Sequence, residues 1–517
     1  MRTRALLVLA GVGALALAAC SSSTTAPPAP APAPEPAQAL PAAAAPAPAA
    51  QVVGSGISGG DPEFTRAAMV WQGYWLSRDH FGPLVMASGM GIPFQPPMDM
   101  VRMAMQMVAQ NPDDPAMVPQ NMMPLQAVFA SGSPALANDP RDFGPMDFEG
   151  LRLDPETFDK RVTVRGQAQT MLKESQWAHS FSSPHFGEPA GDFGAQQRFM
   201  GMMVSMLAQM QGQYAMQNLL SEDGLYHDSD GKLDYLGNWV MLHALSDIAG
   251  LTGEQDGRYA NQEVHPTFEG AASKLFRALE DRQPESAREA AAAIRALVYR
   301  ASTAGDGDVA DAALAKATAI ADRMLLSFNS DDVVEDAAAI VGLVAIAAAQ
   351  DDAKYLSSAD TLFEEMSADF DASSGVFGSK GVYRVDDVAW IVGGLNYLGQ
   401  RGSQISKVPA RAILLAFYES TLSLGGMQLS APPGKNGAMA GEWEKDLPSV
   451  LYYHPAGTPP PAIAGKLPSP AEEISWDGTT WTVTSDRLVP AGAMHLANEL
   501  NWLGPHLGSV PFPEIGR

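Results

Sequence analysis

A succession of helical segments between residues 235 and 424 constrains the fold of this chain more than any other feature. Apolar residues recur at helical spacing in segments of about 15–20 residues, separated by short breaks. The expected helices span 235–250, 267–281, 285–303, 307–328, 332–350, 353–370, 385–399 and 408–424. Because short connections favour antiparallel neighbours, we expect a mainly α fold built from helical hairpins.

The preceding region, residues 61–222, is also expected to be helical and is rich in methionine. Of the 26 methionines, 20 lie between Met69 and Met241. Helices are predicted over 63–80 and 198–220, and a further helix follows Pro96-Pro97. On that helix Met100, Met103 and Met107 share one face. Thioether sulfur is a soft ligand suited to Cu(I), whereas methionine also fills helical cores, so both hypotheses stay open.

His179 and His185 are the candidate metal or acid–base residues of this region. They are close in sequence, they are flanked by aromatic residues, and Glu188 and Asp192 follow them. Their spacing of six fits no standard zinc signature. Roles in a loop and in helix capping are the alternative, and we leave the cofactor open.

The N-terminus predicts export. A positive start containing Arg2 and Arg4 precedes an apolar run from Ala5 to Ala19, which is too short to span a membrane and is typical of a secretion signal. The run ends in Leu17-Ala18-Ala19-Cys20, which resembles the lipobox of bacterial lipoprotein precursors. The resemblance implies that residues 1–19 are removed and that Cys20 is lipidated. It also implies a cell-envelope location, at the outer membrane if the envelope has two membranes.

Residues 20–60 are expected to form a tether without secondary structure. Alanine and proline alternate in Ala29-Pro30-Ala31-Pro32 and again in Pro46-Ala47-Pro48, and proline-dense chains favour an extended conformation. The segment from Gly54 to Gly60 matches glycine-rich nucleotide and nucleophile motifs by letter, but the strand and helix that such motifs need are not predicted around it. Residues 61–222 and 223–517 are expected to pack as one body behind this tether.

Charge and cysteine content narrow the function classes. Cys20 is the only cysteine, so no disulfide can form within the chain. The formal net charge is −25, which disfavours binding to nucleic acid and to anionic lipid, and leaves the N-terminal lipid as the expected membrane attachment. Export also makes a nucleotide cofactor improbable. An envelope polysaccharide or a protein is the expected partner.

Two segments about 150 residues apart resemble each other. Gly224-Leu225-Tyr226 precedes a helix that opens at Tyr235, and Gly375-Val376-Phe377 precedes one that opens near Tyr383. Both helices begin with the pattern Tyr-x-x-Asn/Asp-x-Val. This arrangement is similar to the α/α-toroid proteins, such as the six-hairpin glycosidases and epimerases, in which the loops between helices gather at one end. The resemblance covers residues 220–425 and includes no family-specific catalytic motif.

The toroid resemblance implies a set of candidate site residues at the loop end. Two carboxylates flanked by aromatic rings are what glycoside hydrolysis requires. The candidate catalytic residues are Asp386, Asp387, Asp371 and Tyr383, and the candidate binding residues are Trp390 and Tyr235, with Asp234 beside the latter. The alternative for Asp386 and Asp387 is capping, because both lie at a predicted helix start.

Two further turns are predicted. The segment Asp228-Ser229-Asp230-Gly231 resembles part of a calcium loop but lacks two of the carboxylate ligands, so an Asp-Gly turn is the simpler interpretation. Near the C-terminus, residues 474–483 predict a β-hairpin around Asp477-Gly478, and a last helix is expected over 490–503.

Three hypotheses for the function follow from these patterns. The first is a lipid-anchored envelope protein with a helical binding or structural domain and no catalysis, because no catalytic motif fits its surroundings. The second is a carbohydrate-active enzyme on an α/α toroid, either a hydrolase or a lyase. The third is a methionine-rich lipoprotein that handles Cu(I).

Overall fold

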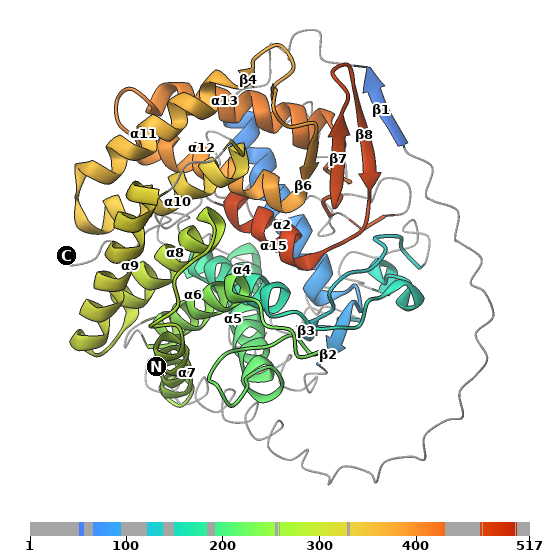
Figure 1. The fold of residues 1–517 in the computed structure, drawn as a ribbon. Helices are drawn as coiled ribbons and strands as arrows, with labels where there is room; N and C mark the ends of the chain where they lie inside the picture. Colours follow the sequence, from blue (N-terminus) through green and yellow to red (C-terminus); the bar gives the residue numbers. More distant parts are fainter. Residues whose placement is uncertain are drawn as a thin grey trace, which may run out of the picture.

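The computed structural model describes residues 51–55, 66–94, 121–137, 149–182, 192–253, 257, 259–327, 331–429, 466–467, 469–501 and 503. Over these residues the chain is mainly helical with a few short antiparallel strand pairs, as the sequence predicts (Figure 1). The predicted helices after residue 235 agree with the observed ones to within a few residues at each end.

A closed ring of helices lies at the centre of the molecule. Its members are α4 (Val164–Ser182), α6 (Tyr235–Gly253), α8 (Ala287–Thr303), α10 (Val333–Gln350), α12 (Val385–Arg401) and α15 (Pro490–Asn501). Each helix packs against the next in this order, and α15 packs in turn against α4. The ring therefore closes on itself.

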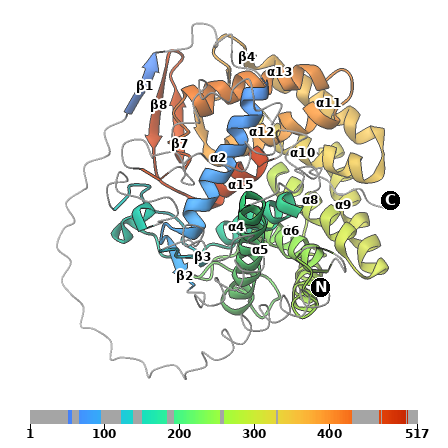
Figure 2. The ribbon, with the colours of Figure 1, turned by 180° about the vertical axis from the view of Figure 1, so that it is seen from behind.

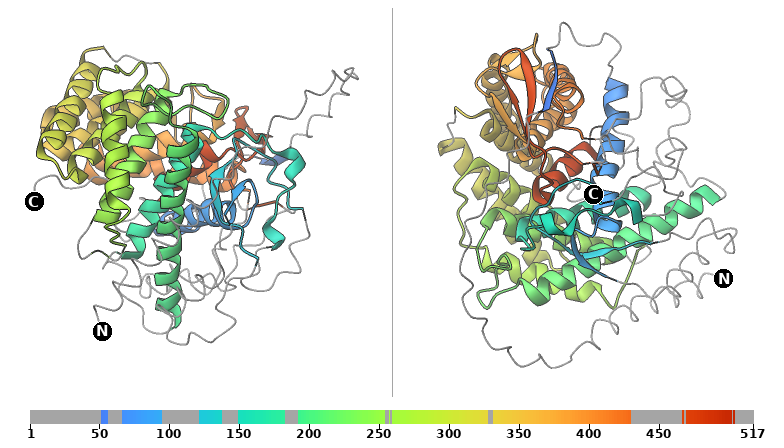
Figure 3. Two further views of the ribbon diagram at one scale, coloured as in Figure 1. Left: turned by 90° about the horizontal axis from the view of Figure 1, so that it is seen from below. Right: turned by 90° about the vertical axis from the view of Figure 1, so that its right-hand side faces the viewer.

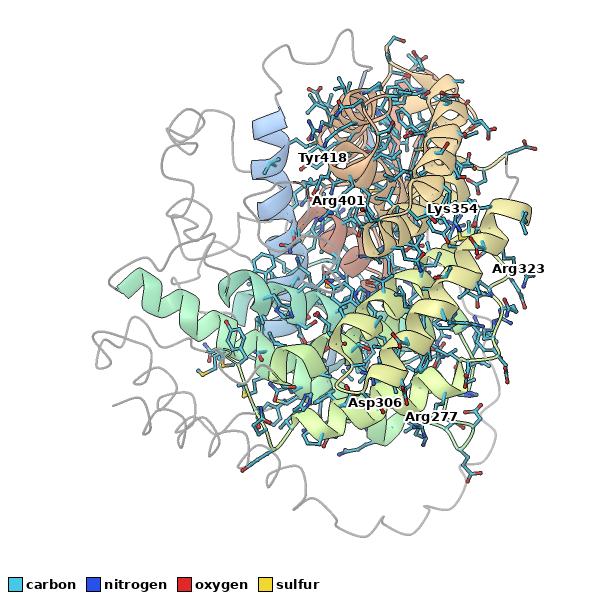
Figure 4. The ribbon with its side chains drawn as sticks, turned by 90° about the vertical axis from the view of Figure 1, so that its left-hand side faces the viewer. Arg277, Asp306, Arg323, Lys354, Arg401 and Tyr418 are labelled. Atoms are coloured by element: carbon cyan, nitrogen blue, oxygen red, sulfur yellow. The ribbon has the colours of Figure 1, made fainter. Side chains whose placement is uncertain are left out.

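A second set of helices packs around the ring. Each of them follows a ring helix along the chain and packs against it: α5 (Asp192–Asn218), α7 (His265–Ala278), α9 (Gly307–Ser327), α11 (Ala353–Ala368) and α13 (Lys407–Tyr418). A π-helical turn over Glu419–Leu424 continues α13. Charged residues on these helices, such as Arg277, Arg323 and Lys354, lie on the outer surface (Figure 4).

The outer partner of α15 comes from the other end of the chain. Helix α2 (Arg66–Met86) packs against α15 (Figure 2). Ser77 donates a hydrogen bond to the Ala497 carbonyl at 2.7 Å, and Lys173 of α4 donates to the same carbonyl at 3.2 Å and to the Ser77 hydroxyl. Residues 420 positions apart therefore complete the sixth helix pair.

Small residues allow the ring helices to approach each other closely. A Cβ atom added to Gly394 of α12 would lie 2.7 Å from the carbonyl oxygen of Ala337 on α10, and one added to Gly342 would lie 3.2 Å from Ala291 of α8. Helix α10 is the described helix that is long and apolar enough to cross a membrane, but 78% of its apolar window is buried within the protein. The other helices of the ring cover its apolar surface.

A small antiparallel sheet lies at one end of the ring. Its strands are β1 (Gln51–Ser55), β8 (Thr480–Ser485), β7 (Glu473–Trp476) and β6 (Val382–Arg384), in that order (Figure 3). The predicted hairpin around Asp477-Gly478 is confirmed, with φ of +95° at Gly478. Strand β1 corrects the expectation for residues 20–60, because its residues pair with β8 instead of continuing the tether.

The remaining described elements are short. Strand β2 (Gly91–Pro93) pairs with β3 (Leu125–Val128), β4 (Phe370–Asp371) pairs with β5 (Val376–Phe377), and 3₁₀ turns occupy Glu149–Leu151 and Pro155–Thr157. The two similar segments of the sequence occupy equivalent places. Each connects an outer helix to a ring helix, and each contains a glycine with positive φ, +85° at Gly224 and +70° at Gly375.

Candidate functional site

The first turns of all six ring helices meet at one end of the ring. Arg165 of α4 forms an ion pair with Asp386 of α12, and Arg288 of α8 lies 3.4 Å from Asp387 of α12. The backbone amide of Ala287 on α8 donates to Glu335 of α10 at 2.8 Å. A Cβ atom added to Gly237 of α6 would lie 3.0 Å from the Arg165 amide, and one added to Gly492 of α15 would lie 3.4 Å from the Asp386 amide. The ring helices are therefore parallel, and their positive dipole ends converge here.

A groove of about 320 Å³ opens at this end, between α4, α6 and α15. Most of its charged side chains come from loops that lead into these helices. The lining residues are Ala130, Ser131, Asp159, Arg161, Thr163, Arg165, Asp228, Lys232, Asp234, Glu472, Arg487, Val489 and Ala491. Four acidic and four basic residues thus face one open depression.

Some of the charged groups in the groove are paired with each other. Arg161 contacts Asp159 at 2.7 Å and Asp230 at 3.2 Å, and Arg487 donates to the Ser131 hydroxyl. These contacts hold the side chains of Arg161 and Arg487 in place. Because cations in the groove are already paired, a ligand does not meet a surface dominated by one sign of charge.

Asp228 and Asp234 lie in the inner part of the groove. Asp228 is buried and caps α4 by accepting the Val164 amide at 2.8 Å. Burial raises the pKa of the Asp228 carboxyl, and the neighbouring Asp234 and Asp230 raise it further. The Asp-Gly turn predicted at Asp230-Gly231 is present, with φ of +84° at Gly231. No cluster of metal-binding residues occurs among the described residues, this turn included.

Asp386 is at the predicted helix start, but it is held in an ion pair. It accepts hydrogen bonds from Arg165 and, at 2.8 Å, from Nδ1 of His495 on α15. Burial alone would raise the pKa of the Asp386 carboxyl, but Arg165 and His495 outweigh burial and hold this pKa well below its usual range. The carboxylate therefore stays charged at neutral pH, and its Oδ1 atom accepts both of these hydrogen bonds.

Asp387 is also paired. Its carboxylate lies 3.0 Å from Lys380 and 3.4 Å from Arg288, and it accepts the Arg384 amide at 3.4 Å. The last contact is the capping interaction that the sequence offered as the alternative. Asp386 and Asp387 do not line the groove.

From Asp386 a chain of ionisable side chains runs along the ring axis. Nε2 of His495 lies 3.7 Å from Glu499, one helical turn further along α15, and Glu499 accepts from Arg295 of α8 at 2.6 Å. The side chains of His495, Glu499 and Arg295 are at most 8% exposed. Burial, assisted by the charge of Arg295, lowers the pKa of the nearby His243 to about 3, so His243 is neutral.

A cavity of about 20 Å³ lies on this axis. Five of the six ring helices line it, with these residues: Arg165, Gln169, Leu172, Leu236, Val240, His243, Ala292, Arg295, Trp390, His495, Asn498 and Glu499. Arg165 lines both the cavity and the groove. The two spaces are therefore separated by this side chain.

Of the predicted site residues that the structure describes, Trp390 is the one that lines this axial cavity. Its ring packs edge-on against His495, with 4.6 Å between ring centroids. The ring of Tyr235 packs instead against the guanidinium of Arg282, whose central carbon lies 3.9 Å from the ring centroid. Tyr383 is buried, and its hydroxyl accepts the Phe377 amide at 3.0 Å.

Asp371 is exposed and accepts hydrogen bonds from Ser373 and Ser374 within its own turn. Neither Asp371 nor Tyr383 lines the groove or the axial cavity. The predicted gathering of these two residues with Asp386 in one cavity is therefore wrong: local turn contacts hold them elsewhere.

Of the five residues predicted to bind a metal, the structure describes only His179. His179 lies at the end of α4 and contacts the buried Asp247 at 3.3 Å, a carboxylate that also accepts from Ser175. This is a helix-to-helix contact between α4 and α6. His185, Met100, Met103, Met107 and the lipidation residue Cys20 lie outside the described residues. On α5, Met203 and Met210 are buried in the core, as packing requires.

The sequence did not identify the axial residues Arg165, His495, Glu499 and Arg295. A signal was present for two of them, since His495 and Glu499 are the two ionisable residues of their helix and lie four positions apart. Their partners on α4 and α8 had no such local signal. Neither models of protein families, curated proteins nor solved structures yield a match to this chain.

Proposed function

We propose that this chain is a lipid-anchored protein of the cell envelope, whose helical ring is an α/α toroid that binds an envelope glycan in the groove without transforming it. The observation that carries this proposal is the groove of about 320 Å³, with its eight charged side chains, at the converging ends of the ring helices. Sugar hydroxyls both donate and accept hydrogen bonds, and they match a wall of intermixed carboxylates and cations.

The lipobox supports the anchoring. Lipidation of Cys20 places the body outside the cytoplasm, on the outer membrane if the envelope has two membranes. Cells expressing the chain should incorporate labelled palmitate into it, and Cys20→Ala should abolish the label and release the protein from the membrane fraction. An unlabelled wild-type chain would contradict the anchor.

A binding function is favoured over catalysis because of the state of the two predicted catalytic carboxylates. Asp386 is paired with Arg165 and His495, and Asp387 with Lys380 and Arg288. A general acid needs a proton near neutral pH, and a nucleophile needs a lone pair that faces the substrate. The pKa of Asp386 is held far below that range, and neither carboxylate lines the groove or the axial cavity.

A glycan array probed with the mature chain tests the binding proposal. Asp234→Asn should weaken binding to any positive glycan about 10-fold, the value of one charge-assisted hydrogen bond. Asp371→Asn is the matched control, because Asp371 is exposed and outside the groove. Equal affinities of the two variants, or no binding to any envelope glycan, would contradict the proposal.

A second candidate function, glycoside hydrolysis, is favoured by one specific observation. Asp228 and Asp234 both line the groove, and burial together with its acidic neighbours raises the pKa of Asp228. Two carboxyls in one groove, one of them with a raised pKa, are the kind of pair that an acid and its partner require. Release of new reducing ends from an array-positive glycan, abolished by Asp228→Asn, would establish this function in place of simple binding.

A further inference from the structure

The axis of the ring is polar where a closed ring of helices would ordinarily bury apolar side chains. Arg165 and Arg295 carry two positive charges, and Asp386 and Glu499 carry two negative charges. The two ion pairs, Arg165–Asp386 and Arg295–Glu499, balance each other in charge. A charged group entering this space would upset the balance, whereas an uncharged polar group would not.

Several buried polar atoms around the cavity have no hydrogen-bond partner among the described residues. Among the cavity-lining residues these are Trp390 Nε1, Arg165 Nε, Glu499 Oε2, Asn498 Oδ1 and His243 Nε2. Four of these five residues, all except Arg165, are at least 97% buried. Buried polar atoms without partners are costly and are rare in folded proteins, so a cluster of them around one cavity indicates a bound group.

The chemistry of these atoms identifies the group. The two N–H atoms of Trp390 and Arg165 donate, whereas the oxygens of Glu499 and Asn498 accept. A hydroxyl carries no charge, donates one hydrogen bond and accepts two, so it can pair with both N–H groups and with one of the two oxygens. A cavity of about 20 Å³ has room for one water-sized group, because about 10–15 Å³ suffices for a water molecule.

The groove and this cavity meet at one side chain. Arg165 lines both spaces, and its ion pair with Asp386 lies at the boundary between them. The side chain of Arg165 is 21% exposed, so it is reached from the groove. A ligand in the groove that extends past Arg165 meets Trp390, Glu499 and Asn498.

We propose that the axial cavity is a subsite for one hydroxyl group of a neutral polyol or sugar that enters from the groove past Arg165. In the free protein the same position suits a water molecule, which the ligand hydroxyl displaces. This inference rests on the proposed glycan-binding function, and it adds the subsite that fixes one end of the ligand.

Crystals of the mature chain soaked in glycerol test the location. A glycerol hydroxyl within hydrogen-bond distance of Trp390 Nε1 and Glu499 Oε2, with Arg165 displaced, is the expected result. Glycerol in the groove alone would overturn the subsite and leave the proposed function standing. Glycerol in neither space would count against both.

A matched pair of tryptophan variants tests the subsite in solution. Trp390→Phe removes an N–H that lines the cavity, and Trp481→Phe removes an equally buried, equally unpartnered N–H in the sheet. Binding of D-glucose or of an array-positive oligosaccharide, followed by ligand-observed NMR, should weaken about 5- to 15-fold in Trp390→Phe and remain unchanged in Trp481→Phe. Equal affinities of the two variants would overturn the subsite, and thermal unfolding of both shows that each is folded.

Discussion

Arg295 and Glu499 face each other from α8 and α15 across the ring axis, at 2.6 Å, with side chains 8% and 1% exposed. Replacing Glu499 by glutamine keeps the shape of the side chain and removes its charge. Arg295 then stays charged and buried without its carboxylate partner, because a guanidinium is not deprotonated in a protein. The remaining neighbour, the ring of Tyr397 at 5.6 Å, is too distant to replace a carboxylate.

The expected cost follows from the burial of both partners. Breaking a buried ion pair by removing one charge costs about 3–5 kcal/mol, because the other charge is left uncompensated. For a folded body of about 350 described residues, the unfolding entropy is about 0.7 kcal/mol per degree, so Glu499→Gln should lower Tm by about 4–7 °C. Exposed pairs are worth much less. Glu285→Gln, which breaks the Arg282–Glu285 contact at a carboxylate that is 77% exposed, should cost at most about 1 kcal/mol.

Urea unfolding of the mature chain, followed by circular dichroism, measures both variants. The double variant Arg295→Met, Glu499→Leu should recover most of the loss, since apolar residues of similar volume replace a buried pair at little cost. A loss for Glu499→Gln no larger than that for Glu285→Gln would refute the argument. So would a double variant that is no more stable than Glu499→Gln.

Three further outcomes are expected from urea unfolding. Burial holds the pKa of Lys173 well below its usual value, so the Lys173 side chain binds a proton more readily in the unfolded chain than in the native state. The free energy of unfolding should therefore rise with pH toward about 10. Lys173→Met should remove this rise and stabilise the protein at pH 7. Burial and the neighbouring carboxylates raise the pKa of Asp336 to about 7, so wild-type stability should fall between pH 4 and pH 7, and Asp336→Asn should flatten this slope. Gly394→Ala should cost about 1–3 kcal/mol because its Cβ would lie 2.7 Å from a backbone oxygen, whereas Gly270→Ala, with open space around it, should gain about 0.5–1 kcal/mol. A stabilised Gly394→Ala would show that the ring helices separate easily.

The helices of this fold could be predicted because their signal is local. Apolar spacing and start residues such as Asp332 and Ser286, which both cap their helices, lie within a few positions of the helix that they define. The similar segments around Gly224 and Gly375 also indicated equivalent loops. Each glycine adopts a positive φ, which is a property of that residue alone.

The site could be predicted only in part, because the residues that contact each other in it are remote in sequence. Asp386 was expected at a helix start, and it is there. Its role depends on Arg165, 221 positions away, and on His495, 109 positions away. No local pattern encodes such distances. An isolated carboxylate at a helix start therefore suggested catalysis or capping, and the ion pair became visible only when the ring brought three helices together.

The pairing of α2 with α15 has a consequence for the order in which the chain can fold. Every other outer helix finds its partner within the preceding few tens of residues, but α2 must wait for a partner that is synthesised about 400 residues later. Until then the face of α2 that packs against α15 stays uncovered. A chain that emerges from a ribosome or a membrane channel therefore cannot close its ring before α15 has emerged. Ring closure has to wait for the last ring helix.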